Sequence, residues 1–398
     1  MKKSVLLVFP MLPYPARQHG ISIRYTPIIE HMTAEHDIHV VVIADESIVG
    51  GDVSVLQGLY KSFKMFKRKK RQVSLVRKLW VRLQSLLPGT TPHAYHCYDA
   101  AEIEKFLRSE VAGLHYDAII WVSSCYIDIG LRVFDPKLIV LDAIDSAYLH
   151  HSRELDRSLL HQLDGRKLLR WEQDVTRSVR ATTYVSPVDA REFARVVSGT
   201  SAVDVIPNGV YFADFASDGA AGSRAGMTLG FLGNMAYPPN IAAAGRLARI
   251  FERLPDSSYR LMIIGRDPVE KVRALASDRV QVTGTVDNIW PYVHSVDCFV
   301  FPMLSGAGQQ NKVLEAMYAE KVVVCNAMAN GGIGGVNGEH LLVCETDEEF
   351  VEAIVSLRAD PARAAAIAAR GRQFVVDNYS WSSIFPKLET LWFTTSVG

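Results

Sequence analysis

Cysteine is scarce in this sequence, and the cysteine patterns of metal-bound and disulfide-bonded proteins are absent. The five cysteines are odd in number and never occur in a C-x-x-C spacing, and the twelve histidines include no His-x-x-x-His pair. Zinc sites use such spacings, and disulfide frameworks need an even number of cysteines. The cysteines are Cys97, Cys125, Cys298, Cys325 and Cys344. We therefore expect no metal site, no disulfide framework and a reducing, cytoplasmic location.

Long apolar runs and net charge are also lacking. No stretch approaches the roughly 20 apolar residues that a membrane-spanning helix needs. The apolar run after Lys2 and Lys3 ends at Pro10 and is too short for a signal peptide, so it predicts a buried strand instead. The formal net charge of zero gives the molecule no overall electrostatic bias toward nucleic acid or lipid. Any such bias must be local.

The apolar residues that are present follow the pattern of parallel sheets with crossover helices. The chain has 398 residues, more than one hydrophobic core usually spans, which favours two domains. Short β-branched runs alternate with amphipathic stretches, such as 241–254 and 312–319, in two successive series. The predicted strands are 5–9, 38–43, 118–122, 138–141, 181–185, 228–232, 259–264, 280–283, 298–301, 322–325 and 341–343. We predict two Rossmann-like doubly wound α/β domains facing across a cleft, which is the expected active site.

The domain boundaries follow from one segment rich in small residues. Residues 216–226 contain mainly Ala, Gly and Ser and little that could pack. We place the first domain at 1–208, a linker at 209–227 and the second domain at 228–378. The aromatic, amphipathic segment 379–398 is expected to return to the first domain.

A basic stretch interrupts the first series. Residues 61–83 carry ten Lys or Arg and no acidic residue, with Phe, Leu and Trp80 between them. Most such charge runs are solvated surface helices. A basic helix with an aromatic and aliphatic stripe is also typical of helices that lie on anionic membranes. The sequence thus leaves open a surface helix and a peripheral contact with the inner face of the cell membrane. Nucleic acid is disfavoured because no nucleic-acid-binding fold accompanies the stretch.

The segment from Phe301 to Tyr318 predicts a site for a phosphate group. A strand leads into a loop with Gly306 and Gly308, and a helical run begins near Asn311. Glycines let the backbone approach a ligand, and a helix N-terminus offers N–H groups and a positive dipole end to an anion. Lys312 opposes that dipole, so helix stability does not explain it, whereas a bound phosphate does. Glu315, three residues on, is placed to accept hydrogen bonds from ribose hydroxyls.

The same segment resembles the donor-binding motif of glycosyltransferase family 4, a group of retaining transferases with the GT-B fold. The resemblance covers most of residues 1–392. The chain is similar above all to the sugar transferases of bacterial exopolysaccharide clusters. The stretches that carry this likeness are Phe231-Leu-Gly-Asn-Met-Ala-Tyr-Pro-Pro-Asn and Asn311-Lys-Val-Leu-Glu. Other matching stretches are Tyr14-Pro to Arg24, Val205-Ile-Pro-Asn-Gly-Val, Leu261-Met-Ile-Ile-Gly-Arg, Val282-Thr-Gly-Thr-Val-Asp-Asn-Ile, Asn330-Gly-Gly-Ile-Gly-Gly-Val-Asn-Gly-Glu-His-Leu-Leu-Val and Tyr379-Ser-Trp.

The resemblance implies an acceptor-binding first domain, a donor-binding second domain and a set of site residues. The implied catalytic residues are Lys312, Glu315 and Arg266. The implied nucleotide-sugar contacts are Gly306, Gly308, Gln309, Gln310, Asn311, Gly265, Thr283, Gly284, Val286, Gly20 and Arg24.

The implied activity is hexosyl transfer with retention, from a UDP- or GDP-linked sugar to a hydroxyl acceptor. The expected acceptor is a glycan or lipid-linked saccharide in bacterial surface or exopolysaccharide synthesis. The reaction is expected to need no cofactor beyond the donor substrate and no metal, because no Asp-x-Asp pair occurs in the chain.

Two positions depart from the family pattern. The first glutamate of the family motif corresponds to Ala307, and an arginine common after the first strand of the second domain corresponds to Asn234. Lys312, Arg266 or Arg24 must then supply the positive charge at the leaving phosphate. These losses keep a second hypothesis open, in which the chain is a non-catalytic nucleotide-sugar-binding homologue that acts as a partner or regulatory subunit.

Other enzyme classes fit the residues less well. A nicotinamide-dependent oxidoreductase would carry Gly-x-Gly-x-x-Gly after the first strand, where this chain has Pro10-Met-Leu-Pro-Tyr-Pro. An epimerase would need carboxylates or histidines for proton transfer. Asp142 and Asp145 follow a strand of the first domain and are acceptor-side candidates, although a helix cap is the favoured interpretation for Asp145.

Overall fold

The computed structural model describes residues 2–14, 20–45, 56, 58–68, 74–85, 87, 89–152, 158–196, 202–210, 226–305 and 308–393. The chain divides into two compact units. The first unit comprises residues 1–206 and 385–398, and the second comprises residues 207–384. Each unit is an α/β structure built on a parallel sheet.

The sheet of the first unit has seven parallel strands in the order β3-β2-β1-β4-β5-β6-β7. The strands are β1 (Ser4–Phe9), β2 (Asp37–Asp45), β3 (Ser62–Arg68), β4 (Ala118–Val122), β5 (Ile139–Ile144), β6 (Ala181–Tyr184) and β7 (Ala202–Val205). The inner strands are buried along almost their whole length, as expected when helices cover both faces of a parallel sheet. The hydrophobic core lies between this sheet and its helices.

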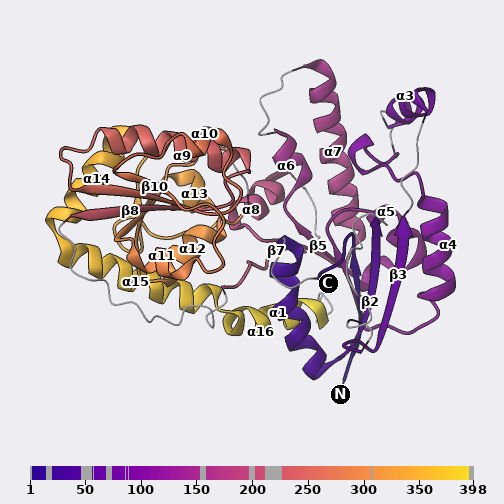
Figure 1. Ribbon diagram of the computed structural model, residues 1–398. Helices are drawn as coiled ribbons and strands as arrows, with labels where there is room; N and C mark the ends of the chain where they lie inside the picture. Colours follow the sequence, from indigo (N-terminus) through magenta and orange to yellow (C-terminus); the bar gives the residue numbers. More distant parts are fainter. Residues whose placement is uncertain are drawn as a thin grey trace. The chain divides into compact units, whose positions relative to one another are not determined.

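The helices of the first unit follow the strands in a βα alternation (Figure 1). They are α1 (Gly20–Glu35), α3 (Leu75–Gln84), α4 (Ala100–Glu110), α5 (Ile127–Val133), α6 (Ala147–Ser152), α7 (Leu159–Ser178) and α8 (Pro187–Val196). The N-terminus of α7 is capped by Ser158, whose side chain accepts a hydrogen bond from the backbone N–H of His161. Short 3₁₀ turns lie at His93–Tyr95 and Pro136–Leu138.

The second unit repeats this architecture with six parallel strands in the order β10-β9-β8-β11-β12-β13. The strands are β8 (Met227–Leu232), β9 (Tyr259–Ile264), β10 (Val280–Val282), β11 (Cys298–Phe301), β12 (Val322–Cys325) and β13 (Leu342–Val343). The helices are α9 (Pro238–Glu252), α10 (Glu270–Arg273), α11 (Trp290–Ser295), α12 (Asn311–Tyr318), α13 (Ala327–Gly331), α14 (Asp347–Ala359), α15 (Pro361–Tyr379) and α16 (Trp381–Phe393). Figure 1 shows α9 and α10 on one face of the sheet and α11, α12 and α15 on the other.

In both sheets the strand order along the chain changes direction once. In the second unit this happens between β8 and β11, because β9 and β10 extend to one side and β12 and β13 to the other. The crossover helices leave the sheet on opposite faces at such a point, and the loops after the two strands diverge. The carboxyl ends of β8 and β11 are therefore the part of this unit most suited to hold a ligand.

The boundary between the two units falls within helix α16. Its residues up to Ile384 belong to the second unit, and Phe385 onward belong to the first. In the first unit the ring of Phe385 stacks on His31 of α1, and the His31 ring nitrogen Nε2 lies 2.7 Å from a carboxylate oxygen of Glu389. Leu388 and Trp392 are almost fully buried.

The eleven strands predicted from the sequence are confirmed, most within one or two residues. Two strands were missed: β3 and β7. The interpretation of residues 61–83 as one helix is wrong in its first part, because Ser62–Arg68 forms the edge strand β3 and only Leu75–Gln84 is helical. Lysines on an edge strand discourage pairing with other chains, and here they obscured the strand. Most of the predicted linker, residues 211–225, lies outside the described residues.

Candidate functional site

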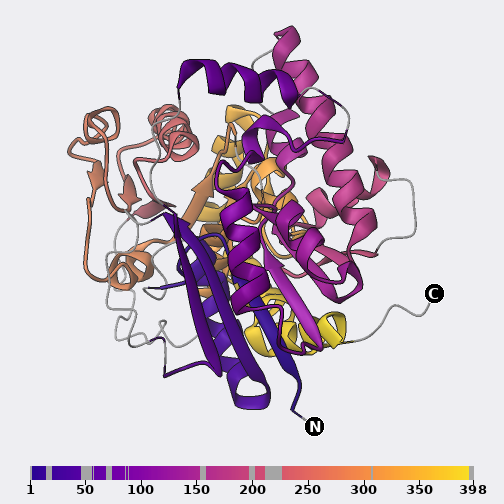
Figure 2. The same cartoon turned by 90° about the vertical axis from the view of Figure 1, so that its right-hand side faces the viewer.

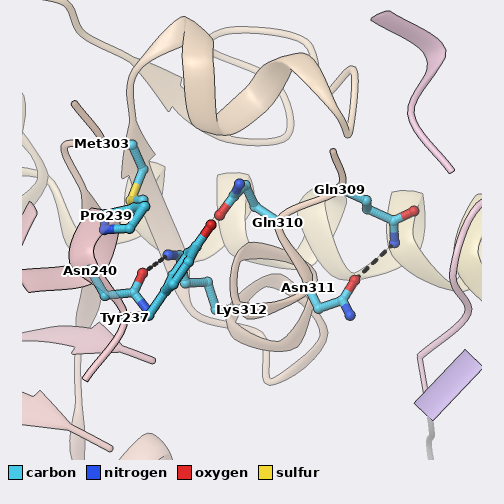
Figure 3. Close-up of a pocket in the computed structure, with 8 residues that line it drawn as sticks. All are labelled: Tyr237, Pro239, Asn240, Met303, Gln309, Gln310, Asn311 and Lys312. Carbon is cyan, nitrogen blue, oxygen red and sulfur yellow. Dashed lines mark hydrogen bonds between the residues drawn. The ribbon is translucent and has the colours of Figure 1, made fainter. Parts of the chain in front are cut away.

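A cavity of about 350 Å³ lies at the switch point of the second unit. It is lined by the loop and helix that follow β8 and by the loop and helix that follow β11 (Figure 3). The lining residues are Tyr237, Pro239, Asn240, Met303, Gln309, Gln310, Asn311 and Lys312. The volume is in the range of small-molecule sites.

Lys312 brings the positive charge to this cavity. It lies in the first turn of α12, and its ammonium group donates a hydrogen bond of 2.5 Å to the side-chain oxygen Oδ1 of Asn240. The ammonium also lies 5.5 Å from the centre of the Phe231 ring. Burial lowers the pKa of Lys312 to about 8, and the nearby Glu315 carboxylate offsets part of that effect. An anion bound beside this lysine would raise the pKa of its ammonium group and favour the charged form.

The N-terminus of α12 adds backbone donors beside Lys312. The N-cap residue Gln310 makes no side-chain cap hydrogen bond, and the first turn carries no acidic residue. The first N–H groups of a helix have no partner within the helix, and the helix dipole is positive at this end. Backbone and lysine together suit a phosphate group.

Asn240 is fixed by the loop after β8. Its side-chain nitrogen donates to the backbone oxygen of Asn234 at 2.9 Å, and the side chain of Asn234 accepts from the N–H of Ala236 at 2.9 Å. Gly233 lies under the Asn240 amide, since a Cβ atom at Gly233 would be 2.7 Å from that nitrogen. Asn234, one of the two departures from the pattern that the sequence resembles, therefore shapes the loop that positions Asn240.

Gly265 permits the close approach of the loops after β8 and β9. Its φ is +154°, and a Cβ atom there would lie 1.7 Å from the carbonyl oxygen of Gly233. Its N–H donates to the hydroxyl of Thr283 at 3.2 Å, and that hydroxyl donates to the carbonyl of Gly284 at 3.0 Å. Gly265, Thr283 and Gly284 thus form one hydrogen-bonded strand-end group, and none of them is among the residues that line the cavity.

Gln309 anchors the loop before α12. Its side-chain amide accepts from the N–H of Asn208 at 2.9 Å and donates to the carbonyl of Asn208 at 2.8 Å. Gly308 before it has φ +71°, and a Cβ atom at Gly332 would be 2.4 Å from the Gly308 carbonyl. Gln309, a predicted ligand contact, lines the cavity and also positions this loop. Gly306 and Ala307 lie outside the described residues.

The other predicted residues of the second unit lie away from the cavity lining. Arg266 is exposed and lies 3.8 Å from a carboxylate oxygen of its neighbour Asp267. Glu315 is half-buried on α12, close enough to Lys312 to affect the pKa of its ammonium. Val286 is half-buried in the loop after β10.

The predicted residues of the first unit lie at the carboxyl end of its own sheet or beside it. Gly20 is exposed at the start of α1. The guanidinium of Arg24 donates to both carboxylate oxygens of Asp142, at 2.7 and 3.2 Å, and both side chains are buried. Tyr25 and Thr183 also donate to this carboxylate, at 2.5 and 3.0 Å. Arg24 and Asp142, predicted as a phosphate contact and an acceptor-side residue, are thus bound to each other.

Comparison with known proteins decides the family of the second unit. Residues 226–360 match the family model described as Glycosyl transferases group 1. The second unit is a group 1 glycosyltransferase domain. The matched residues include β8, β11, α12 and every residue that lines the cavity.

A curated relative and two solved structures extend the comparison beyond this transferase domain. The chain is 29% identical over 239 residues to the GDP-mannose-dependent alpha-(1-6)-phosphatidylinositol monomannoside mannosyltransferase of Mycolicibacterium smegmatis. That alignment covers 52% of this chain and 61% of the mycobacterial protein, so the chain matches less than two thirds of its relative.

The two solved structures match over almost the whole chain. Sucrose-phosphate synthase from Thermosynechococcus elongatus has a TM-score of 0.69 at 16% identity, with 98% of each chain covered. The Anabaena protein HepE, in complex with UDP and glucose, has a TM-score of 0.66 at 14% identity, covering 97% of this chain and 99% of that one. At these identities the likeness establishes the fold, which is that of the GT-B glycosyltransferases.

The transferase domain contains site residues that the sequence did not single out. Tyr237, Pro239, Asn240 and Met303 line the cavity, and none was predicted as a contact. The signal was available, because the switch-point rule applies to the loops after both β8 and β11. The prediction rested on the loop with the glycines and Lys312 and did not extend to the loop with Tyr237-Pro-Pro-Asn240.

Proposed function

We propose that the protein is a glycosyltransferase that binds the diphosphate of a nucleotide sugar at the switch point of its transferase domain. The observation that carries the proposal is the half-buried Lys312 ammonium in the first turn of α12, beside a cavity of about 350 Å³. A buried cation with a lowered pKa gains most from an anionic partner, because the partner restores the charge that burial disfavours.

The proposed reaction breaks the bond between the anomeric carbon of the sugar and the β-phosphate oxygen. A new bond forms between that carbon and an acceptor hydroxyl oxygen, and the hydroxyl proton passes to the departing phosphate. Lys312 and the first amides of α12 stabilise the charge that develops on the diphosphate. Stabilisation by a lysine and a helix N-terminus supports a metal-independent reaction, and the resemblance to family 4 supports retention at the anomeric carbon.

The donor and the acceptor are proposed from the relatives. The mycobacterial relative is named for GDP-mannose and the Anabaena structure contains UDP, which supports a UDP- or GDP-linked hexose as donor. The phosphatidylinositol mannoside in the name of the former supports a lipid-linked saccharide as acceptor. The resemblance of the Phe231–Asn240 stretch to transferases of exopolysaccharide clusters supports a role in bacterial surface or exopolysaccharide synthesis. The five free cysteines suit the cytoplasm.

The test is release of nucleoside diphosphate from a panel of UDP- and GDP-sugars in the presence of saccharide or lipid-linked acceptors. We expect turnover with donors of one base, and we expect Lys312→Ala to lower it about a hundredfold or more. Lys271→Ala is the matched control, because Lys271 is an exposed lysine on α10 of the same unit. Equal turnover by wild type and Lys312→Ala would remove Lys312 from the proposed mechanism.

The second candidate is a non-catalytic nucleotide-sugar-binding subunit. Asn234 favours it, because this side chain shapes its own loop at a position where an arginine would otherwise supply charge. Tight, base-selective binding of a nucleotide sugar with no release of diphosphate across the acceptor panel would support this candidate against the enzyme.

A further inference from the structure

An amphipathic helix of the first unit is exposed on its apolar side. Helix α3 has one buried residue, Val81, and its large apolar side chains are otherwise in solvent. Leu75, Val76, Leu79, Trp80 and Leu83 are between 57% and 82% exposed. They recur at helical spacing and form one stripe. Soluble helices normally turn such a stripe toward a core.

The start of α7 contributes to the same surface. Leu159, Leu160 and Leu163 are 72%, 58% and 38% exposed. Arg82 of α3 joins the two helices, because its guanidinium donates two hydrogen bonds, of 2.7 and 2.5 Å, to the carboxylate of Asp164 on α7. Figures 1 and 2 place both helices at the same end of the first unit.

We name this surface, formed by α3 and the start of α7, the α3–α7 tip. Most of the exposed large apolar side chains among the described residues lie on it. Among the described residues, nine of the fifteen large apolar side chains that are exposed lie here. They are Leu75, Val76, Leu79, Trp80, Leu83, Leu87, Leu159, Leu160 and Leu163. Scattered exposed leucines need no explanation, but a cluster of this kind marks a contact surface.

The charge of the tip identifies its partner. Residues 75–84 and 159–170 contain six basic side chains and one acidic side chain, in a chain whose formal net charge is zero. The basic residues are Arg77, Lys78, Arg82, Arg166, Lys167 and Arg170. The single carboxylate, Asp164, is paired with Arg82. Apolar side chains flanked by cations match a bilayer, whose apolar interior lies beneath a layer of anionic head groups.

We propose that the α3–α7 tip docks on the surface of an anionic lipid bilayer, with the apolar stripe of α3 in the head-group region. The exposed basic side chains would reach the phosphate groups while their aliphatic stems lie against the bilayer surface; they are those of Arg77, Lys78, Arg166 and Arg170. The contact is peripheral, since no helix among the described residues is long and apolar enough to cross a membrane. It depends on α3 and α7 alone and not on transferase activity, so it can be tested without knowing donor or acceptor.

The test is co-sedimentation of the purified protein with vesicles of phosphatidylcholine alone and of phosphatidylcholine mixed with phosphatidylglycerol. We expect binding to the mixed vesicles that is about tenfold or more tighter than to the neutral ones and that weakens as salt is added. The double variant Leu79→Glu, Trp80→Glu should bind the mixed vesicles about tenfold or more weakly. Leu114→Glu is the matched control, because Leu114 is an exposed leucine of the same unit outside the tip.

A second measurement follows the tip directly. Trp80 is the one tryptophan of the six that is more than half exposed, so vesicle binding should shift the fluorescence emission to shorter wavelength. Trp80→Phe should keep binding and lose the shift, which separates docking from misfolding of a charged variant. Wild-type binding that is equal to that of the double variant, or absent, would overturn the proposal. Self-association without lipid that the double variant abolishes would instead assign the tip to a second copy of the chain.

Discussion

At the scale of residues, the candidate site depends on one lysine whose charged form is disfavoured by burial. Burial lowers the pKa of Lys312 to about 8, and Asn240 accepts its hydrogen bond in the free protein. The sequence predicted Lys312, because a cation in the first turn of a helix opposes the dipole and needs another reason to be there. It did not predict Asn240, because an asparagine after a Pro-Pro pair looks like ordinary loop chemistry until its partner is known.

The lowered pKa of Lys312 predicts uptake of protons when nucleotide binds. In the free protein at pH 8 about half of the Lys312 side chains are neutral, and a bound diphosphate raises the pKa of the ammonium and draws a proton from solution. Calorimetric titration at pH 8 in buffers of different ionisation enthalpy should therefore show uptake of about half a proton. Above pH 8 the nucleotide affinity should fall by up to about tenfold per pH unit.

Lys312→Arg supplies the control for this measurement. A guanidinium stays charged throughout this pH range, so the uptake at pH 8 should vanish even if binding persists. Equal proton uptake by the wild type and Lys312→Arg would show that another group is titrating.

At the scale of elements, two glycines hold the loops after β8 and β9 together. Gly265 is the clearer case, since both its φ of +154° and the 1.7 Å approach of a Cβ atom to the Gly233 carbonyl exclude a side chain. The sequence indicated a glycine at the end of a strand but not the neighbour that requires it. The basic stretch was harder to predict, because the charged residues in 62–68 conceal the alternation of a strand. This strand is defined by its pairing with β2, a contact between residues distant in the sequence.

Substitution of Gly265 should disrupt the second unit at this point. We expect Gly265→Ala to destabilise the protein by about 2–4 kcal/mol and to weaken nucleotide binding, because the loop after β8 must move. Gly245→Ala is the matched control, since Gly245 lies within α9 with no atom near an added Cβ and should stabilise the helix by about 0.5–1 kcal/mol. Thermal unfolding of both variants checks this pair. A melting temperature for Gly265→Ala equal to that of the wild type would contradict the role of the glycine.

At the scale of the whole molecule, the sequence predicted the architecture well. Two series of buried β-branched runs gave two parallel sheets, and the TM-scores to known GT-B structures agree with that class. The sequence did not show which polar residues bind other residues of the protein. The resemblance implied Arg24 as a ligand contact, and the structure adds that its guanidinium is buried and bound to Asp142. Only the tertiary arrangement distinguishes a charge that binds substrate from one that binds the protein itself.

The most direct test of the central claim is a calorimetric titration of the intact chain with UDP and with GDP, for the wild type and for Lys312→Ala. The claim is that the switch point of the second unit holds a nucleoside diphosphate through Lys312. It predicts saturable binding of one of the two nucleotides at one site per chain, weakened about tenfold or more in Lys312→Ala. Binding of neither nucleotide, or equal affinity in the two proteins, would contradict it.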